Sequence, residues 1–323
     1  MIKEDQKLNI ALYIGSWPQN IGNAFFDLGL EAIVKKAFPN ANIYYTGGAV
    51  HWMFNHPRKI ITKTFFGNKI EEKSYIKNSV EIAQFANVDI VVVPGMCLTR
   101  EFVDNNGKTF LELSKRKIPV FFVGAGALEY TQEESNYYAN FLNNFYKYSI
   151  ITRDDNTFEM LKKSGVKNIE KGIDCAFFLP DRYSPPKLSI DKFNVMNFDS
   201  TQEPNTIDHK GVKVFRTHHN CWGPLPENYV NKEDTLVSDV PFDYLALYGN
   251  VNETYSDRVH ACVATLAYGN KARLFSKTPR ASLFKKVGAE KITQELTSVD
   301  MKLLQTLKTR QIDLVKKIIN ELI

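Results

Sequence analysis

Short apolar runs alternate with segments of helical spacing along the first half of the chain. Residues 8–14, 88–93 and 119–123 are apolar runs of the length expected for buried strands. Between such runs, residues 26–37 and 134–146 carry apolar side chains at helical spacing. Strands that alternate with helices in this way predict βαβ units and a parallel sheet.

The alternation is interrupted twice. Residues 47–75 follow no clear period, and residues 181–187 combine two prolines with polar side chains. The second interruption is typical of a domain boundary. Beyond it, strands expected at 193–198 and 212–215 and a helix expected at 257–268 predict a second, smaller α/β unit. We therefore expect α/β domains over residues 1–183 and 190–298, and a C-terminal helix over residues 299–323 that packs back on the first domain.

Composition narrows the class of protein. The chain has 323 residues, which favours two domains or one large α/β domain. Its 44% of hydrophobic and 24% of charged residues are typical of a soluble globular protein. The 41 basic residues exceed the 36 acidic ones by only five and are scattered, so nucleic acid is not an expected partner. An anionic small molecule or an anionic surface stays open.

The cysteines and the N-terminal residues exclude two further classes. The four cysteines, Cys97, Cys175, Cys221 and Cys262, lack the paired spacing of zinc sites and thiol redox motifs, so we expect reduced, mostly buried thiols and no metal. The first residues are polar, and no apolar run reaches the length of a membrane span before Pro18. We therefore expect a cytoplasmic protein.

Residues 256–269 form the segment most informative about chemistry. Arg258 and His260 flank the buried face of the expected helix within its first turn, where the helix dipole disfavours positive charge by roughly 0.3–1 kcal/mol. Two potentially cationic side chains beside unpaired backbone N–H groups suit a bound anion. The structural alternative pairs Arg258 with a carboxylate such as Asp257 and leaves His260 hydrogen-bonded in the core.

Other cationic side chains follow expected strands or begin expected helices. Arg216 and His218 follow a strand of the second unit, and the carboxyl ends of parallel strands face the ligand crevice of open α/β sheets. Lys277 and Arg280 stand at the start of another helix, and Arg153 stands at a strand end. Solvated positions are the alternative for the histidine, Lys277 and Arg280.

In the first half, Asn20, Gly22 and Asn23 form a loop between a strand and a helix, which can hold a ligand. Their spacing matches neither a dinucleotide fingerprint nor a P-loop. At the other end of the chain, the basic amphipathic helix could lie on a membrane. Its acidic residues Asp300 and Asp313 favour packing against the protein instead.

Four segments, taken in order, resemble a known family. They are residues 20–23, the strand 88–95, residues 152–166 with Asp174, and residues 256–268. Within the last, Arg258-Val259-His260-Ala261 is similar to the Arg-Leu-His-Ala of the polysaccharide pyruvyl transferases. The chain departs from that family at Asn23, where an Asp is usual, and at residues 95–97, where a run of glycines is usual.

The resemblance implies an architecture and a reaction. The fold it implies is α/β, with two Rossmann-like domains in a glycosyltransferase-B-like arrangement and mainly parallel sheets. The implied donor is phosphoenolpyruvate, with no separate cofactor, and the acceptor is a hydroxyl pair of a sugar or a lipid-linked oligosaccharide. The product is a pyruvate ketal on a surface or secreted polysaccharide. Contact with the inner face of a membrane and homo-oligomerisation stay open.

This reading assigns roles to the candidate residues. We expect Arg258 and Arg216 to bind the two anionic groups of phosphoenolpyruvate, and His260 to act as acid or phosphate partner. Asp174 is a candidate base, as is Asp154. The remaining candidates for substrate binding are His218, Lys277, Arg280, Arg153, Asn20, Gly22 and Asn23. Two alternatives stay open: a glycosyltransferase that uses Arg258 and Lys277 on a nucleotide sugar, and a non-catalytic carbohydrate-binding subunit.

Overall fold

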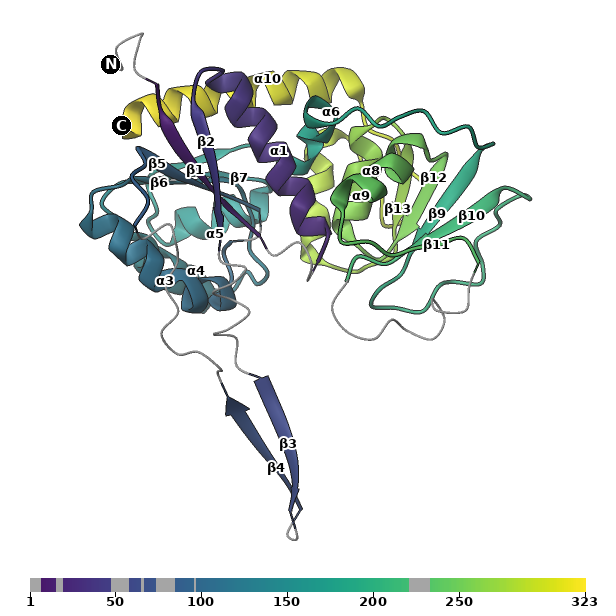
Figure 1. Cartoon of the computed structure of the whole chain (residues 1–323), viewed down its shortest axis with the longest axis horizontal. Coiled ribbons are helices and arrows are strands. Elements are labelled where there is room, and N and C mark those ends of the chain that lie inside the picture. Colours follow the sequence, from purple (N-terminus) through teal and green to yellow (C-terminus); the bar gives the residue numbers. More distant parts are fainter. Residues whose placement is uncertain are drawn as a thin grey trace.

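A computed structural model of the chain describes residues 7–15, 20–47, 58–64, 67–73, 85–95, 97–220 and 233–323. It consists of two lobes, each built on a parallel β-sheet with helices packed against it (Figure 1). The strand order is β2-β1-β5-β6-β7-β8 in the first sheet and β11-β10-β9-β12-β13 in the second. The parallel sheets predicted from the alternating pattern are therefore confirmed in both halves of the chain.

The first lobe contains the longer sheet. Its central strands are buried along their whole length, which is typical of a parallel sheet covered by helices on both faces. The strands are β1 (Asn9–Ile14), β2 (Asn42–Gly47), β5 (Ile90–Pro94), β6 (Val120–Ala125), β7 (Tyr148–Thr152) and β8 (Ile169–Lys171), and the helices are α1 (Gly22–Ala37), α3 (Arg100–Lys115), α4 (Gln132–Leu142) and α5 (Asp155–Lys163).

The segment that follows no clear period forms an antiparallel pair of strands, β3 (Arg58–Thr64) and β4 (Gly67–Lys73). These two strands extend away from the first lobe (Figure 1). This hairpin was not predicted, because the segment has neither a helical period nor a long apolar run.

The second lobe follows a connection made of η2 (Cys175–Phe178) and α6 (Leu179–Arg182). Its strands are β9 (Phe193–Asn197), β10 (Lys213–Thr217), β11 (Thr235–Leu236), β12 (Glu253–Ser256) and β13 (Lys271–Leu274), and its helices are α8 (Pro241–Asn250), α9 (Val259–Ala267) and the 3-10 helix η3 (Pro279–Val287). The last helix, α10 (Met301–Leu322), packs against α1 and β7. Lys36 of α1 and Lys308 of α10 both pair with Asp181 of α6.

Helix α1 joins the hydrophobic cores of the two lobes. It packs against η2, α6 and α10 and also against α8 and α9 of the second lobe. One continuous cluster of buried side chains therefore runs from Ile10 and Leu12 through Phe25 to Val263 and Phe284. Because α1 contacts both lobes, its packing fixes how the two sheets face each other.

His219 lies inside this shared core, between α1 and α8. Its ring makes edge contacts with Phe25 and Tyr244, and its Nε2 atom is 2.7 Å from the hydroxyl oxygen of Tyr248, a hydrogen-bond distance. Burial lowers the pKa of His219 well below its ordinary value, and the charge on Arg258 acts in the same direction. The imidazole is therefore neutral in the folded protein at neutral pH.

Among the described residues, no helix is both long and apolar enough to cross a membrane. Of the four cysteines, Cys97, Cys175 and Cys262 are free and buried, as expected, and Cys221 lies outside the described residues.

Gly29 allows α1 to pack directly on backbone. A Cβ atom at this position would lie 1.8 Å from the carbonyl oxygen of Cys175, so Gly29→Ala must push α1 away from η2. We expect a loss of about 3 kcal/mol in the free energy of unfolding, the upper end of the usual cost of overpacking, measured by chemical denaturation. Gly107→Ala in α3 is the matched control, because the nearest atom to its added Cβ is 4.0 Å away. The control is expected to be neutral or to stabilise by up to about 1 kcal/mol. Equal midpoints for the two variants would contradict the close packing of α1.

The neutral His219 predicts loss of stability in mild acid. Because its pKa is lower in the folded than in the unfolded protein, only the unfolded chain takes up this proton as the pH falls below about 6.5. The free energy of unfolding should then fall by up to about 1.4 kcal/mol per pH unit from this group. Denaturation of His219→Gln between pH 7.5 and pH 5 should show a shallower pH dependence than the wild type. An unchanged slope would contradict burial of a neutral imidazole.

Candidate anion site between the two lobes

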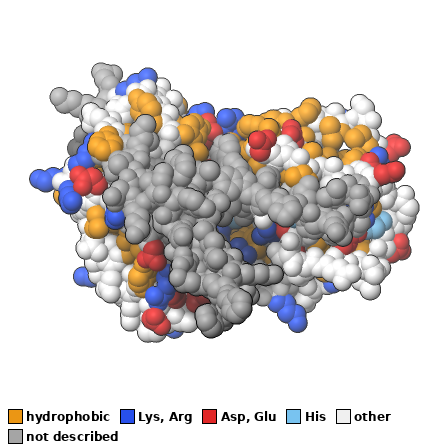
Figure 2. Space-filling model, turned by 60° about the horizontal axis from the view of Figure 1, so that its bottom comes forward, with side chains coloured by type: hydrophobic (Ala, Val, Ile, Leu, Met, Phe, Trp, Pro, Cys, Tyr) orange, Lys and Arg blue, Asp and Glu red, His pale blue; other side chains and the backbone are white. Residues whose placement is uncertain are grey.

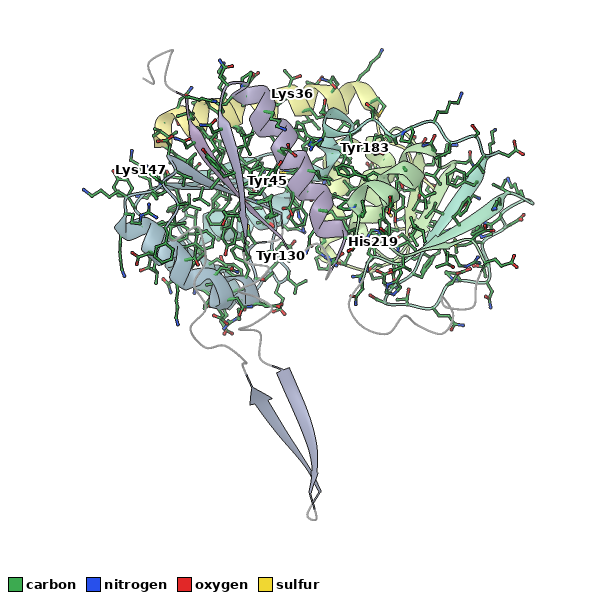
Figure 3. All side chains as sticks on the ribbon, in the orientation of Figure 1. Lys36, Tyr45, Tyr130, Lys147, Tyr183 and His219 are labelled. Atoms are coloured by element: carbon green, nitrogen blue, oxygen red, sulfur yellow. The ribbon has the colours of Figure 1, made fainter. Side chains whose placement is uncertain are left out.

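The carboxyl ends of both sheets face the junction between the lobes. Arg153 directly follows β7, and Arg258 follows β12. Figure 3 labels His219 beside the junction end of α1, and Figure 2 shows Lys and Arg side chains in the hollow between the two lobes. Residues that lie far apart in the sequence therefore meet at this junction.

A row of three side chains crosses the junction. The Nη1 atom of Arg153 donates a 2.9 Å hydrogen bond to Oδ2 of Asp174, and both side chains are almost fully buried in the first lobe. The same carboxylate oxygen lies 3.5 Å from Nε2 of His260, which belongs to α9 of the second lobe. The Oδ1 atom of Asp174 accepts a hydrogen bond from the backbone N–H of Ala176. Asp174 therefore bridges the lobes, as an ion pair on one side and a longer polar contact on the other.

Two buried nitrogen atoms in this row lack a hydrogen-bond partner among the described residues: Nε of Arg153 and Nε2 of His260. Buried polar atoms without partners are rare in folded proteins and are found at sites that bind ligands. The guanidinium of Arg153 also needs a glycine beside it, because a Cβ atom at Gly126 would lie 2.3 Å from Nε of Arg153.

Burial and charge set the protonation states of this row. Burial alone would raise the pKa of Asp174, but its contact with His260 and the charge on Arg153 hold that pKa below its ordinary value. Burial lowers the pKa of His260, and although Asp174 opposes this, the charges on Arg153 and Arg280 act with burial. The free protein therefore presents an ionised Asp174 and a neutral His260 at neutral pH.

Arg258 occupies the N-cap position of α9. Its Nε atom donates a 2.8 Å hydrogen bond to Oδ2 of Asp199, a carboxylate only 1% exposed. The structural alternative from the sequence is therefore partly realised, but the partner is Asp199. Asp257 instead accepts backbone hydrogen bonds from residues 199–201. The terminal nitrogens of Arg258 make no hydrogen bond with any residue that the structure describes, and the side chain is 27% exposed. They are available to a ligand.

Arg280 brings a third guanidinium to the same place. Its Nε atom donates a 3.3 Å hydrogen bond to Oγ1 of Thr278, which caps η3. Burial lowers the pKa of Arg280, and the charges on Arg153 and Arg258 lower it further. Arg280 therefore lies within electrostatic reach of Arg153 and of Arg258. Asp174 pairs with Arg153, and Asp199 pairs with Arg258.

The start of α1 packs against His219 and His260, at one side of the site. The backbone N–H of Ile21 donates to the carbonyl of His219 at 2.9 Å. A Cβ atom at Gly22 would lie 3.3 Å from Cβ of His260, and the side chain of Asn20 accepts the backbone N–H of Gly22. The structure therefore brings Asn20 and Gly22 to the site. The side chain of Asn23 lies beside Gly15.

Other predicted residues lie differently. Arg216 makes two hydrogen bonds to Glu203, at 3.0 and 2.8 Å, instead of facing Arg258 as a second clamp. Its guanidinium is neutralised by that pairing. Lys277 is exposed to solvent. His218 is buried close to the anion site. Its Nε2 atom lies 3.9 Å from Oδ1 of Asp199, and its Nδ1 atom lies 2.9 Å from the carbonyl oxygen of Asn220.

Sequence reasoning missed Asp199, which holds Arg258 in place. Its carboxylate also accepts the backbone N–H of His219 at 3.0 Å and the side-chain amide of Asn197 at 3.0 Å. Asp199 stands just beyond the end of β9. The rule that selected Arg216, that residues after parallel strands face the ligand crevice, applies to Asp199 equally and could have found it.

Comparison with solved structures identifies the fold. UDP-N-acetylglucosamine 2-epimerase from Rickettsia bellii is similar over 98% of this chain and 96% of its own, at 14% identity and a TM-score of 0.54. UDP-GlcNAc 2-epimerase from Neisseria meningitidis matches over 95% of this chain and 92% of its own, at 12% identity and a TM-score of 0.49. The glycosyltransferase SnogD from Streptomyces nogalater matches over 98% and 99%, at 11% identity and a TM-score of 0.41. The first likeness, together with the two parallel sheets, confirms the expected pair of Rossmann-like domains in a glycosyltransferase-B-like arrangement.

Comparison of sequences gives the family. No protein of curated function matches the chain significantly. The family model described as polysaccharide pyruvyl transferase matches residues 20–276, a range that holds the start of α1, the row of Arg153, Asp174 and His260, and the N-cap of α9. That range covers most of the chain, and so the chain belongs to the polysaccharide pyruvyl transferase family.

Proposed function

We propose that the protein transfers the pyruvyl group of phosphoenolpyruvate to a pair of sugar hydroxyl groups and forms a ketal. The observation that supports this most is the gathering of the guanidinium groups of Arg153, Arg258 and Arg280 at the junction, where Asp174 holds Arg153 and Asp199 holds Arg258. Phosphoenolpyruvate carries a carboxylate and a phosphate on one small frame. Binding it needs several fixed cations, and guanidinium groups suit both anions because they donate two parallel hydrogen bonds.

In this proposal the two lobes supply different donors. Arg258 and Arg280 approach the donor from the second lobe, and Asp199 orients Arg258 through its Nε atom so that its terminal nitrogens face the ligand. Arg153 approaches from the first lobe. Arg280 takes the donor-binding role that was first expected of Arg216, because Arg216 is paired with Glu203.

His260 is the group that supplies a proton. A bound phosphate beside the neutral imidazole raises its pKa, so His260 becomes protonated and acts as general acid. The proton goes to the methylene carbon of phosphoenolpyruvate, which leaves an oxocarbenium-like centre at the neighbouring carbon. One sugar hydroxyl attacks this centre, phosphate departs, and the second hydroxyl completes the ketal. Of the two hydroxyl protons released, one returns to His260 and the other leaves with phosphate. Asp174 holds the imidazole in position across the junction.

The remaining parts of the proposal concern the acceptor and the setting. No cofactor is needed, because the enol phosphate itself carries the activated pyruvyl group. The acceptor is a sugar, free or in a lipid-linked oligosaccharide, with two hydroxyl groups close enough to close a ring. The family supports polysaccharide modification as the purpose of the reaction. We place the reaction in the cytoplasm.

Removal of the guanidinium group of Arg258 or of Arg280 should weaken the binding of phosphoenolpyruvate. Charge-assisted hydrogen bonds contribute about 1.5–3 kcal/mol each, so Arg258→Ala and Arg280→Ala should each raise the Kd of phosphoenolpyruvate at least about tenfold by calorimetry. The rate of phosphate release in the presence of acceptor glycans should fall as donor binding weakens. Arg310→Ala, on the exposed face of α10, is the matched control and should bind the donor like the wild type. Donor binding that survives both site variants, or tighter binding of UDP-N-acetylglucosamine than of phosphoenolpyruvate, would contradict the proposal.

Donor binding should also be linked to protonation of His260. Because the pKa of His260 lies below its ordinary value in the free protein and a bound anion raises it, binding takes up protons and weakens as the pH rises. Calorimetry at one pH in buffers of different ionisation enthalpy counts these protons. The wild type should take up more protons per bound phosphoenolpyruvate than His260→Gln, by up to one proton. Identical proton counts for the two proteins would rule out His260 as the group that protonates.

A further inference from the structure

A polar groove of about 470 Å³ opens between α4 and α5 of the first lobe. Its volume falls within the range of about 300–1,000 Å³ that is typical of small-molecule sites. The side chains that matter for its chemistry are those of Tyr130, Thr131, Gln132, Asn156, Glu159 and Lys163. The anion site does not use any of them.

One end of the groove lies at the edge of the sheet where ligands bind. Tyr130 stands in the connection after β6, and Asn156 is the second residue of α5, which follows β7, so both come after the carboxyl ends of parallel strands. A second cavity of about 470 Å³, lined by Tyr146 and Lys147 among others, lies at the opposite end of the same sheet, where β7 begins. Open α/β sheets hold their ligands at the carboxyl ends, which favours the groove at Tyr130.

Tyr130 connects the groove with the anion site. Its hydroxyl donates a 3.3 Å hydrogen bond to the carbonyl of Ala127, so the position of the ring is fixed. Burial raises the pKa of Tyr130 and Asp154 adds to this, while the charges on Arg153 and Arg280 act in the opposite direction. The ring therefore lies within electrostatic reach of both guanidinium groups. Figure 3 places Tyr130 on the first-lobe side of the junction, on the same side of the molecule as His219.

The lining offers the contacts that a sugar ring uses. The amide of Asn156 and the ammonium group of Lys163 make no hydrogen bond or ion pair with any of the described residues. Thr131 accepts the backbone N–H of Glu134 and keeps its own hydroxyl proton free to donate. Amides and hydroxyls bind sugar hydroxyl groups, and the apolar face of a tyrosine ring packs against the C–H face of a pyranose.

We propose that this groove is a subsite for a neutral hexopyranose unit of the acceptor glycan. Tyr130 forms the wall that the glycan passes, so the sugar in the groove is the neighbour of the sugar that reacts beside Arg153 and Arg280. The role as an acceptor subsite rests on the proposed function, whereas the binding of a hexopyranose in the groove does not.

The test measures glycan binding directly, without turnover. The probe is an array of neutral oligosaccharides of glucose, galactose, mannose and their N-acetylated forms, followed by titration of the best binder. Tyr130→Ala and Asn156→Ala should each weaken that binding at least tenfold, and Tyr130→Phe should keep most of it because the ring remains. Tyr146→Ala, in the second cavity, is the matched control and should bind within twofold of the wild type. Circular dichroism checks that each variant is folded.

Two results would overturn the subsite: no glycan of the array binds the wild-type protein, or binding is unchanged in both Tyr130→Ala and Asn156→Ala. Titration of phosphoenolpyruvate with the same proteins separates this proposal from the proposed function. If the wild type fails to bind phosphoenolpyruvate but glycan binding follows the groove variants, the donor assignment is wrong and the subsite stands. If phosphoenolpyruvate binds but the groove variants do not affect glycans, the subsite is wrong and the donor assignment stands.

Discussion

Three guanidinium groups, from Arg153, Arg258 and Arg280, are held together at the junction of the two sheets. Bringing like charges together in a partly buried place is unfavourable: burial lowers the pKa of Arg280, and the charges on Arg153 and Arg258 lower it further. Two carboxylates, Asp174 and Asp199, offset part of the charge and hold two of the guanidiniums in place. Phosphoenolpyruvate, the ligand proposed for this site, carries two anionic groups that guanidinium groups can bind.

The anion site exists only while the two lobes keep their relative positions. Arg153 and Asp174 come from the first lobe, whereas His260 and Arg258 come from the second. Helix α1 maintains these relative positions. It packs on η2 through Gly29, and its first residue, Gly22, packs against His219 and His260. Neither glycine carries a functional side chain. A larger residue at either position would nevertheless shift the packing of the lobes and so displace the side chains of the anion site.

Local pattern predicted more of the fold than of the contacts between distant residues. The apolar spacing of residues 257–268 predicted α9, which spans Val259–Ala267, and with it the placement of His260 in the first turn; Arg258, predicted in the same turn, stands one position earlier at the N-cap. The partner of Arg216 could not be predicted in this way, because Glu203 stands in a polar loop without a period. The meeting of Asp174 with His260 depends on how two domains pack, and no spacing in either segment encodes that distance. The family likeness, which rests on four segments and most specifically on Arg258-Val259-His260-Ala261, is the source of the proposed reaction, which the pattern alone left open.

A crystal structure of the protein grown with phosphoenolpyruvate tests most directly whether the guanidinium groups at the junction bind this donor. We expect the ligand between the lobes, with its carboxylate and phosphate oxygens about 3 Å from guanidinium nitrogens of both Arg258 and Arg280 and with His260 beside it. Ligand bound elsewhere on the protein, with Arg258 still in contact with Asp199 alone, would contradict it.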